Sequence, residues 1–322
     1  MTWRRGVASI LALALAACAP AVATLPPGPV AAGPAIAIAA TPASLNPQDP
    51  AQDRIGEFVY AGGAALSSGD TARFHGLSEL DLLPNGEIVA ITDEGDLLRA
   101  RLVHDRQGRL TGLSNARLSA LAGPDGKPLP DKASSDAEGL AALPGGDLLV
   151  SFERDHRILL YPADGSAPRL VPAPAGPFPP NGGMEALFAD PTAGPDAYVT
   201  AGEDSGETWT CRLSAACTPG PTLAKPKEFG VVAGRKLPDG RTAWLLRAWD
   251  PIRGSRIALI VRDGERETAR LELARPLTVD NFEGLAVAPQ PDGALRFYLL
   301  SDDNFQASQR TLLLAFDWTP RD

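Results

Sequence analysis

The sequence predicts an all-β chain folded as a β-propeller, and three observations support this prediction. First, one pattern recurs: an acidic turn, an apolar strand, a turn rich in Gly and Pro, and a second apolar strand. Its five copies lie at 74–95, 136–155, 182–206, 228–250 and 280–305. Second, the chain contains 32 Gly and 31 Pro in 322 residues, well above the usual share of about 12%. Third, no stretch after residue 20 keeps apolar residues at helical spacing for four turns without a Gly or Pro.

Repeats of roughly 40–50 residues that consist of strands and turns are typical of propeller blades. Aligning the small residue after the acidic turn makes five positions equivalent: Gly76, Gly139, Ala186, Gly230 and Gly284. Two strand-like segments, 54–66 and 309–318, flank the repeats, and we expect them to share one further blade. The sequence therefore predicts six blades, closed by strands from both chain ends, with five blades as the alternative.

The composition limits the classes of function. A hydrophobic content of 44% is sufficient for a core, and the repeats cover enough of the chain to favour one closed domain. The net charge of −9 argues against a nucleic-acid partner and agrees with a surface that attracts cations. The sequence contains no nucleophile elbow, Walker loop or dinucleotide fingerprint, which excludes an α/β-hydrolase in particular. We expect a monomer.

The first 18 residues have the features of a targeting segment. Arg4 and Arg5 precede an apolar run at 6–17, which is too short to span a bilayer. Leu15-Ala16-Ala17-Cys18 matches the lipobox of bacterial lipoproteins, in which the Cys becomes lipidated. We therefore expect a protein that faces the periplasm and is attached to the outer membrane through the lipid on Cys18 only. A plain signal peptide cut after Ala23, giving a soluble periplasmic or secreted protein, is the alternative.

Residues 19–52 are rich in Ala and Pro and carry few charges. Such a composition favours extended conformations and does not bury a core. We expect these residues to be a tether and the propeller domain to comprise residues 53–322. Within the domain, Cys211 and Cys217 are spaced as for a short disulfide-closed loop in an oxidising compartment, with metal binding as the competing interpretation.

Acidic residues recur at two places in the repeats. In three copies the first strand opens with a glutamate: Glu138, Glu185 and Glu283. In four copies the second strand ends with an acid: Asp93, Glu153, Glu203 and Asp302. Because equivalent positions of blades around an axis form a ring, we expect these carboxylates near the mouth of the central channel. Carboxylates that share one place repel each other, so they either bind cations or pair with Arg and backbone N–H groups.

Two interpretations of this ring remain open. Calcium suits a site made of oxygen ligands in variable number. Alternatively, each glutamate accepts backbone N–H bonds that tie one blade to the next. Arg247 stands where the other copies carry an acid, so it holds an anionic substrate or is the counterion of a neighbouring glutamate. His75, His104 and His156 are the only histidines, so a Ser-His-Asp triad would have to use one of them.

The repeats contain the motifs Phe74-His-Gly-Leu-Ser, Asp136-Ala-Glu-Gly-Leu and Met184-Glu-Ala-Leu. The most specific motifs are Asn281-Phe-Glu-Gly and Ser301-Asp-Asp-Asn-Phe near the C-terminus. Together they resemble the phytase-like family, called "esterase-like activity of phytase", from about residue 54 to residue 318. The resemblance implies an exported bacterial propeller that hydrolyses phosphate or carboxylic esters.

Alkaline propeller phytases use calcium held by channel carboxylates. The resemblance therefore implies a set of calcium ligands: Asp93, Glu138, Glu153, Glu185, Glu203, Glu283 and Asp302. The candidates for a catalytic role are Glu138, Glu283, His75 and Arg247. The chain is poor in the Lys and Arg residues that would surround phytate, so we expect a small-molecule ester or phosphoester as substrate. A non-catalytic propeller that binds a ligand or a protein at the cell envelope is the alternative function.

The lipobox leads to a testable prediction. Because lipidation requires the thiol of Cys18, Cys18→Ser should release the protein into the soluble periplasmic fraction. Cell fractionation and mass spectrometry of the wild type and the variant would measure this. A variant that stays in the membrane fraction with an unchanged mass would contradict the lipobox.

Overall fold

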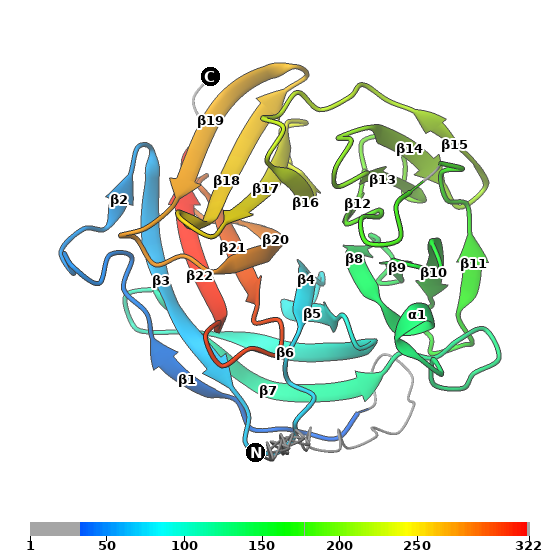
Figure 1. Ribbon diagram of the computed structural model, residues 1–322, viewed down its shortest axis with the longest axis horizontal. Coiled ribbons are helices and arrows are strands. Elements are labelled where there is room, and N and C mark those ends of the chain that lie inside the picture. Colours follow the sequence, from blue (N-terminus) through cyan, green and yellow to red (C-terminus); the bar gives the residue numbers. More distant parts are fainter. Residues whose placement is uncertain (1–32, 177, 321–322) are drawn as a thin grey trace, which may run out of the picture.

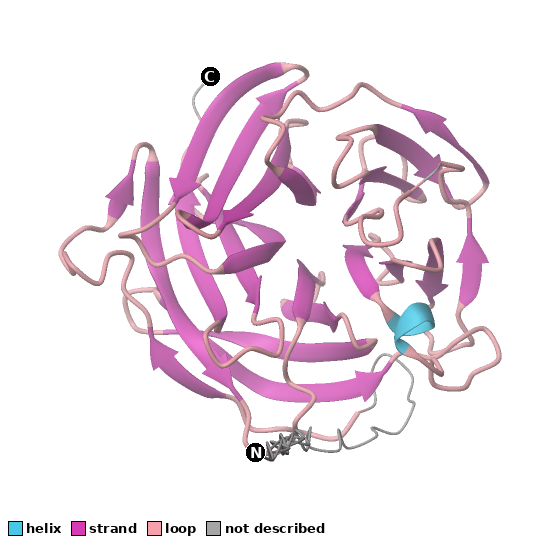
Figure 2. Cartoon of the chain, in the orientation of Figure 1, coloured by secondary structure: helices cyan, strands magenta, loops and turns pink. Residues whose placement is uncertain are grey.

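The computed structural model describes residues 33–176 and 178–320, and strands dominate this part of the chain (Figures 1 and 2). The described strands form five blades of four strands each around a central axis; three blades are separate sheets, and a single bridge joins the other two, with two short added strands, into a ten-stranded sheet. Blade 1 contains β4 (Leu77–Leu82), β5 (Glu87–Thr92), β6 (Asp96–His104) and β7 (Leu110–Ala120). Blade 2 contains β8 (Ala137–Ala142), β9 (Leu148–Phe152), β10 (Arg157–Tyr161) and β11 (Arg169–Val171). Blade 3 contains β12 (Ala186–Ala189), β13 (Ala197–Ala201), β14 (Thr208–Arg212) and β15 (Ala215–Pro219).

Blade 4 contains β16 (Gly230–Lys236), β17 (Thr242–Asp250), β18 (Gly254–Asp263) and β19 (Arg266–Leu273). Blade 5 contains β20 (Asn281–Pro289), β21 (Leu295–Asp302), β22 (Thr311–Trp318) and β3 (Phe58–Ser67). The single described helix, α1 (Lys132–Ser135), lies between β7 and β8. The first strands of the blades, β4, β8, β12, β16 and β20, contact one another in this order, and β20 contacts β4. The ring of inner strands is therefore closed.

The two ends of the propeller chain share blade 5. Strand β22 pairs with β3 in an antiparallel register that joins Thr311 to Leu66 and Asp317 to Val59. Closure by strands from both chain ends is confirmed. The expectation of six blades differs from the five blades of the described chain, because these two strands complete the sheet begun by β20 and β21. A single parallel bridge between Gly62 and Leu110 links β3 to β7 of blade 1.

The folded domain begins before the Asp53 that we expected. Strand β1 (Ala39–Pro42) pairs with β3, and β2 (Arg54–Ile55) pairs with the other end of the same strand. Leu45 is buried, and Ala35 forms an isolated bridge with Arg117 of β7. Residues 35–52 therefore cover the outer strands of blades 5 and 1, because exposed strand edges gain hydrogen bonds from an added strand. The lipobox and Cys18 lie outside the described residues, and no described helix is long and apolar enough to cross a membrane.

Apolar side chains fill each interface between blades. The described residues contain five buried apolar clusters, one for each pair of neighbouring sheets. Between blades 3 and 4, for example, the rings of Phe188 and Trp244 pack edge to face with centroids 5.3 Å apart. Burial of this apolar surface is the main favourable term in folding. Cys211 and Cys217 join β14 to β15 as a disulfide, which confirms the disulfide interpretation of their spacing.

A buried arginine spans the channel below the ring of acidic positions. Arg235 of β16 donates hydrogen bonds to the carbonyl oxygens of Leu187 on β12 and Leu80 on β4. Its guanidinium lies 3.3 Å from Glu79 Oε1, and that oxygen also accepts from the backbone N–H of Leu285 on β20, at 2.8 Å. Burial raises the pKa of Glu79 well above its usual range, although the charge of Arg235 acts to lower it. Four inner strands therefore meet at one polar contact.

The Arg235 contact predicts a large loss of stability on substitution. Arg235→Leu should lower the free energy of unfolding by about 3–5 kcal/mol, because it leaves Glu79 buried without its partner. The double variant with Glu79→Leu should recover part of this loss. Urea unfolding would measure both effects. Arg266→Leu, at an exposed side chain paired with Asp263, is the control and should change stability by less than about 1 kcal/mol. An equally small loss in Arg235→Leu would contradict the prediction.

Candidate functional site

In four of the five blades the inner strand carries one extra residue where it enters the sheet. The pairing register shifts between Leu77 and Glu79 in blade 1, and likewise in blades 2, 4 and 5. In blade 3 the equivalent residue directly precedes β12. The residues at these bulge positions are Ser78, Glu138, Glu185, Val232 and Glu283. Bulges of this kind redirect side chains and are common beside active sites.

This register corrects our alignment of two repeats. In blade 1 the residue equivalent to Gly139 is Glu79, not Gly76. In blade 4 it is Ala233, not Gly230. Both errors arose because a glycine three residues upstream has the same local appearance in the sequence. The three glutamates at bulge positions were placed correctly, whereas blades 1 and 4 have no acid there.

A second set of equivalent positions lies where the second strand of each blade ends. Asp302 pairs with Asn281 and Arg247 pairs with Gly230 in the ladders of blades 5 and 4. Backbone hydrogen bonds place Asp93, Glu153 and Glu203 at the same position in the other three blades. Arg247 therefore stands where the other blades carry an acid, as the sequence indicated. The two sets of positions form the channel mouth of the propeller.

Several of these acids have no protein partner. In the described chain the carboxylates of Glu138, Glu153 and Glu185 form no hydrogen bond and no ion pair. Glu153 and Glu185 are nevertheless shielded, since each is only 8% exposed, and Glu138 is half-buried. They do not tie one blade to the next. Glu79, which the sequence did not single out, does so instead through Leu285.

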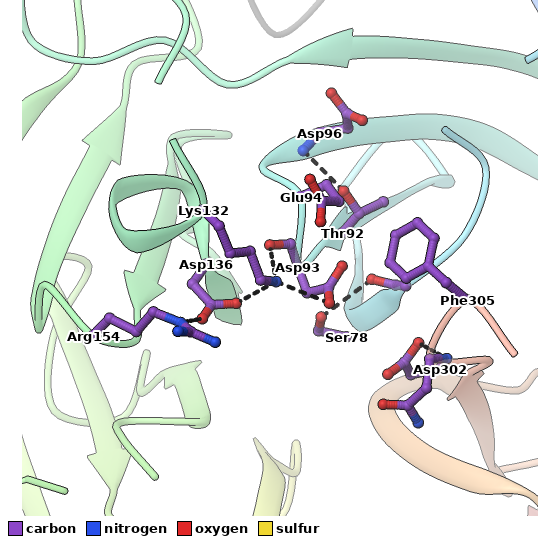
Figure 3. A network of polar contacts seen from close by, with 12 residues as sticks. Ser78, Thr92, Asp93, Glu94, Asp96, Lys132, Asp136, Arg154, Asp302 and Phe305 are labelled. Carbon is purple, nitrogen blue, oxygen red and sulfur yellow. Dashed lines mark hydrogen bonds and ion pairs between the residues drawn. The ribbon is translucent and has the colours of Figure 1, made fainter. Parts of the chain in front are cut away.

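Three of the acids converge closely. Asp136, Glu138 and Glu153 each place a carboxylate oxygen within 4.8 Å of the others. Asp136 is itself held by Lys132 of α1, whose Nζ lies 2.6 Å from Asp136 Oδ1, and by Arg154 (Figure 3). These contacts fix the position of Asp136 and leave Glu138 and Glu153 free. Asp136 and Lys132 were missing from our site residues, because the role of α1 depends on tertiary structure that the repeat does not reveal.

Lys132 also connects this cluster to blade 1. Its Nζ lies 2.9 Å from Asp93 Oδ2, and it donates a second bond to the backbone carbonyl of Asp93 (Figure 3). The other carboxylate oxygen of Asp93, Oδ1, is buried and has no hydrogen-bond partner in the described residues. A buried polar atom of this kind is costly unless a ligand or an ion satisfies it.

The opposite side of the mouth is organised by Arg247. Its Nη1 lies 2.5 Å from Glu283 Oε1 and 2.7 Å from Asn281 Oδ1, and its Nη2 lies 3.2 Å from Glu203. Burial disfavours the charged guanidinium, but Glu283, Glu185 and Glu203 raise the pKa of Arg247 above its usual value. Glu283 and Glu203 are thus partly neutralised, in contrast to Glu138 and Glu153.

The crowded acids hold protons more tightly than usual. Burial raises the pKa of Glu138 and of Glu185 well above the usual value, and neighbouring acids add to the effect. Burial and Asp136 raise the pKa of Glu153 to about 7. Burial and Glu283 raise the pKa of Asp302 to about 8. Without a cation, the channel mouth therefore stabilises protonated carboxyls near neutral pH.

His75 lies at the edge of the same mouth. Its Nδ1 is 2.7 Å from Asp303 Oδ2, which also accepts a hydrogen bond from Thr311. Burial acts to raise the pKa of Asp303, but bonds from His75, Gly76 and Thr311 bring it below its usual value. A carboxylate that orients one ring nitrogen leaves the other free to accept or donate a proton. No serine is bonded to His75 in the part of the chain that the structure describes, so a Ser-His-Asp triad is not formed there.

Comparisons with known proteins place the chain in a family. No curated protein matches the sequence. Among solved structures, a putative gluconolactonase shares 13% identity over 90% of this chain and 92% of its own, with a TM-score of 0.48. A virginiamycin B lyase from Staphylococcus aureus shares 10% identity over 87% of this chain and 99% of its own, with a TM-score of 0.44. The phytase-like family, described as "Esterase-like activity of phytase", matches residues 72–305, and the chain belongs to that family.

Proposed function

We propose that the protein is a hydrolase of phosphate or carboxylic esters and that its channel mouth binds calcium. The observation that carries this proposal is the convergence of Asp136, Glu138 and Glu153 within 4.8 Å, with two of the three carboxylates unbonded. The description of the family supports ester hydrolysis as the reaction class. If these carboxylates only joined neighbouring blades, they would accept hydrogen bonds from those blades.

The residues of the mouth fit a hard divalent cation. Calcium prefers carboxylate and carbonyl oxygens, and soft ligands are absent from the cluster formed by Asp136, Glu138 and Glu153. Asp93 of the neighbouring blade, whose buried Oδ1 is unbonded, adds negative charge near this cluster. Glu185 supplies further negative charge from blade 3. A bound cation would offset the repulsion that raises the pKa of these groups.

Calcium bound there would act as a Lewis acid toward an ester oxygen and would favour ionisation of a water molecule. The chain itself contributes fixed charges around that site. Lys132 and Arg154 hold Asp136 in place, and Arg247 offers a half-buried cation that can pair with an anionic substrate group. His75 can hold or release a proton at Nε2, because Asp303 binds its Nδ1.

The second candidate function is a ligand-binding propeller without catalysis. It requires the same converging carboxylates but no proton-transfer group, so the His75–Asp303 pair favours the hydrolase. Attachment to the outer membrane through Cys18, with the domain in the periplasm, is part of the same proposal, as is a monomeric state.

The calcium site is tested by thermal unfolding. A ligand that binds only the folded state stabilises it by about 2.7 kcal/mol at a hundredfold excess over its Kd. Calcium should therefore raise the Tm of the wild type, and Glu138→Gln should abolish this increase because it removes a ligand charge. Hydrolysis of a panel of phosphate and carboxylic esters should be lost both in Glu138→Gln and with a chelator.

The control variant is Glu265→Gln, which makes the same chemical change at an exposed turn between β18 and β19. It should keep the calcium-dependent increase in Tm and the hydrolysis. A wild type whose Tm does not respond to calcium, or hydrolysis that survives in Glu138→Gln and with a chelator, would remove the metal from the function.

The raised pKa values predict how stability depends on pH. Glu153 changes from 4.5 to about 7 on folding, and Asp302 from 3.8 to about 8. A folded state that binds more protons than the unfolded state loses stability as pH rises. Metal-free protein should therefore lose at least about 1 kcal/mol of unfolding free energy between about pH 5 and pH 8. Calcium should reverse the trend, because ionised carboxylates bind it better. Urea unfolding across this range measures both, and a metal-free stability that rises toward pH 8 would contradict the prediction.

A further inference from the structure

A separate pocket opens on the mouth side of the propeller between blades 4 and 5. It has a volume of about 530 Å³, which lies within the usual range for small-molecule sites. Four segments line it: the turn from β17 to β18, the segment between β19 and β20, the segment between β21 and β22, and Pro47 between β1 and β2. The ends of β17 and β21 also carry Arg247 and Asp302 of the mouth. The pocket and the mouth therefore share one face of the molecule.

Two arginines give this pocket a positive charge in an otherwise acidic protein. Arg275 lies against Gly254, where an added Cβ would be 3.4 Å from the guanidinium carbon. In the described chain no carboxylate pairs with Arg275 and no hydrogen bond uses its side chain. Arg310, the second arginine, is 52% exposed and lies 3.5 Å from Asp280.

Two other arginines near this pocket form ion pairs with a carboxylate. Arg253 lies 2.7 Å from Asp250, and Arg256 lies 3.4 Å from the same carboxylate. Arg275 has no such partner, although it lies against Gly254 in the turn between β17 and β18. A planar guanidinium without a carboxylate partner is suited to bind the oxygens of a phosphate or carboxylate ligand.

The pocket also presents a large aromatic side chain. Trp249 lines it and is 65% exposed, which is unusual for a residue whose burial is strongly favourable. The amide oxygen of Gln309, another lining residue, is buried without a hydrogen-bond partner in the described chain. An aromatic surface beside two guanidinium groups fits a ligand that is anionic at one end and flat and apolar at the other.

We propose that this pocket binds a small anion that carries an aromatic group, such as an aryl phosphate or aryl carboxylate. Arg275 and Arg310 bind the anionic group, and Trp249 packs against the ring. Asp280 lines the pocket, and the next residue, Asn281, donates a hydrogen bond to Glu283 of the mouth, at 3.0 Å. A ligand anchored here therefore lies beside the mouth. The ligand can be the substrate only if the proposed function is correct. Its binding to the pocket does not depend on that function.

None of the proposed calcium ligands lines the pocket, so binding to the pocket can be measured without calcium. Calcium is removed with a chelator, and the chelator is then dialysed away. Isothermal titration calorimetry measures the Kd of phenyl phosphate and of inorganic phosphate. We expect Arg275→Gln and Arg310→Gln each to weaken phenyl phosphate binding about tenfold or more, as for a lost charged hydrogen bond. Trp249→Ala should weaken phenyl phosphate and leave inorganic phosphate unchanged.

Arg266→Gln is the matched control, because its exposed side chain pairs with Asp263 away from the pocket. Both of its Kd values should equal those of the wild type. Binding in Arg275→Gln and Arg310→Gln that equals the control, or no binding of phenyl phosphate to the metal-free wild type, would overturn the proposal. Trp249→Ala with unchanged phenyl phosphate binding would overturn the role of the ring. Glu138→Gln should still bind phenyl phosphate, so loss of hydrolysis is distinguishable from loss of this pocket.

Discussion

The contact between Arg235 and Glu79 is the constraint on which the rest of this propeller depends. A blade has apolar faces that only its neighbours can cover, so the sheets are stable only as a closed ring. Apolar packing is non-directional and does not by itself fix the heights of the inner strands. Arg235 and Glu79 do, since they bind β12, β4 and β20 at defined atoms. Such a buried pair costs solvation, and its value lies in the single register that it allows.

That register determines where the charges of the mouth lie. Once the inner strands are fixed, the bulge glutamates and the acids after the second strands face one channel from several blades. Their closeness is then imposed by the fold, and repulsion cannot separate them. The raised pKa of Glu138, Glu153 and Asp302 is the consequence. Repulsion between these acids lowers the stability of the folded state. Burial of apolar surface at the five blade interfaces offsets this cost, as is common at functional sites.

The sequence predicted the periodic part of this structure better than the irregular part. The repeat revealed the strands and both acidic positions, and the position of Arg247 was correct because it occupies a repeated register. The sharing of one blade by both chain ends was predicted, but the favoured count of six differs from the structure because β22 and β3 complete the sheet of β20 and β21 and do not form a blade of their own. The equivalence of Gly76 and Gly230 failed because each glycine lies three residues before the equivalent position and has the same local appearance in the sequence. Lys132 was missed because its contact with Asp93 joins two blades and depends on tertiary structure, although its other partner, Asp136, is only four residues away.

The departures from symmetry carry the functional argument. Five identical blades would place five acids at the bulge positions and five at the ends of the second strands. No positive charge would then balance them. Here Val232 replaces a bulge glutamate and Arg247 replaces an acid, both in blade 4. The unbonded acids Glu138, Glu153 and Glu185 therefore lie on blades 2 and 3, and Arg247 carries positive charge on the neighbouring blade 4, where it pairs with Glu203 and Glu283. The pocket with Arg275 and Arg310 lies next to blade 4 as well. One side of the face suits a cation and the other an anion, and the ester hydrolase that we propose would use this separation of charge to hold a metal and its substrate together.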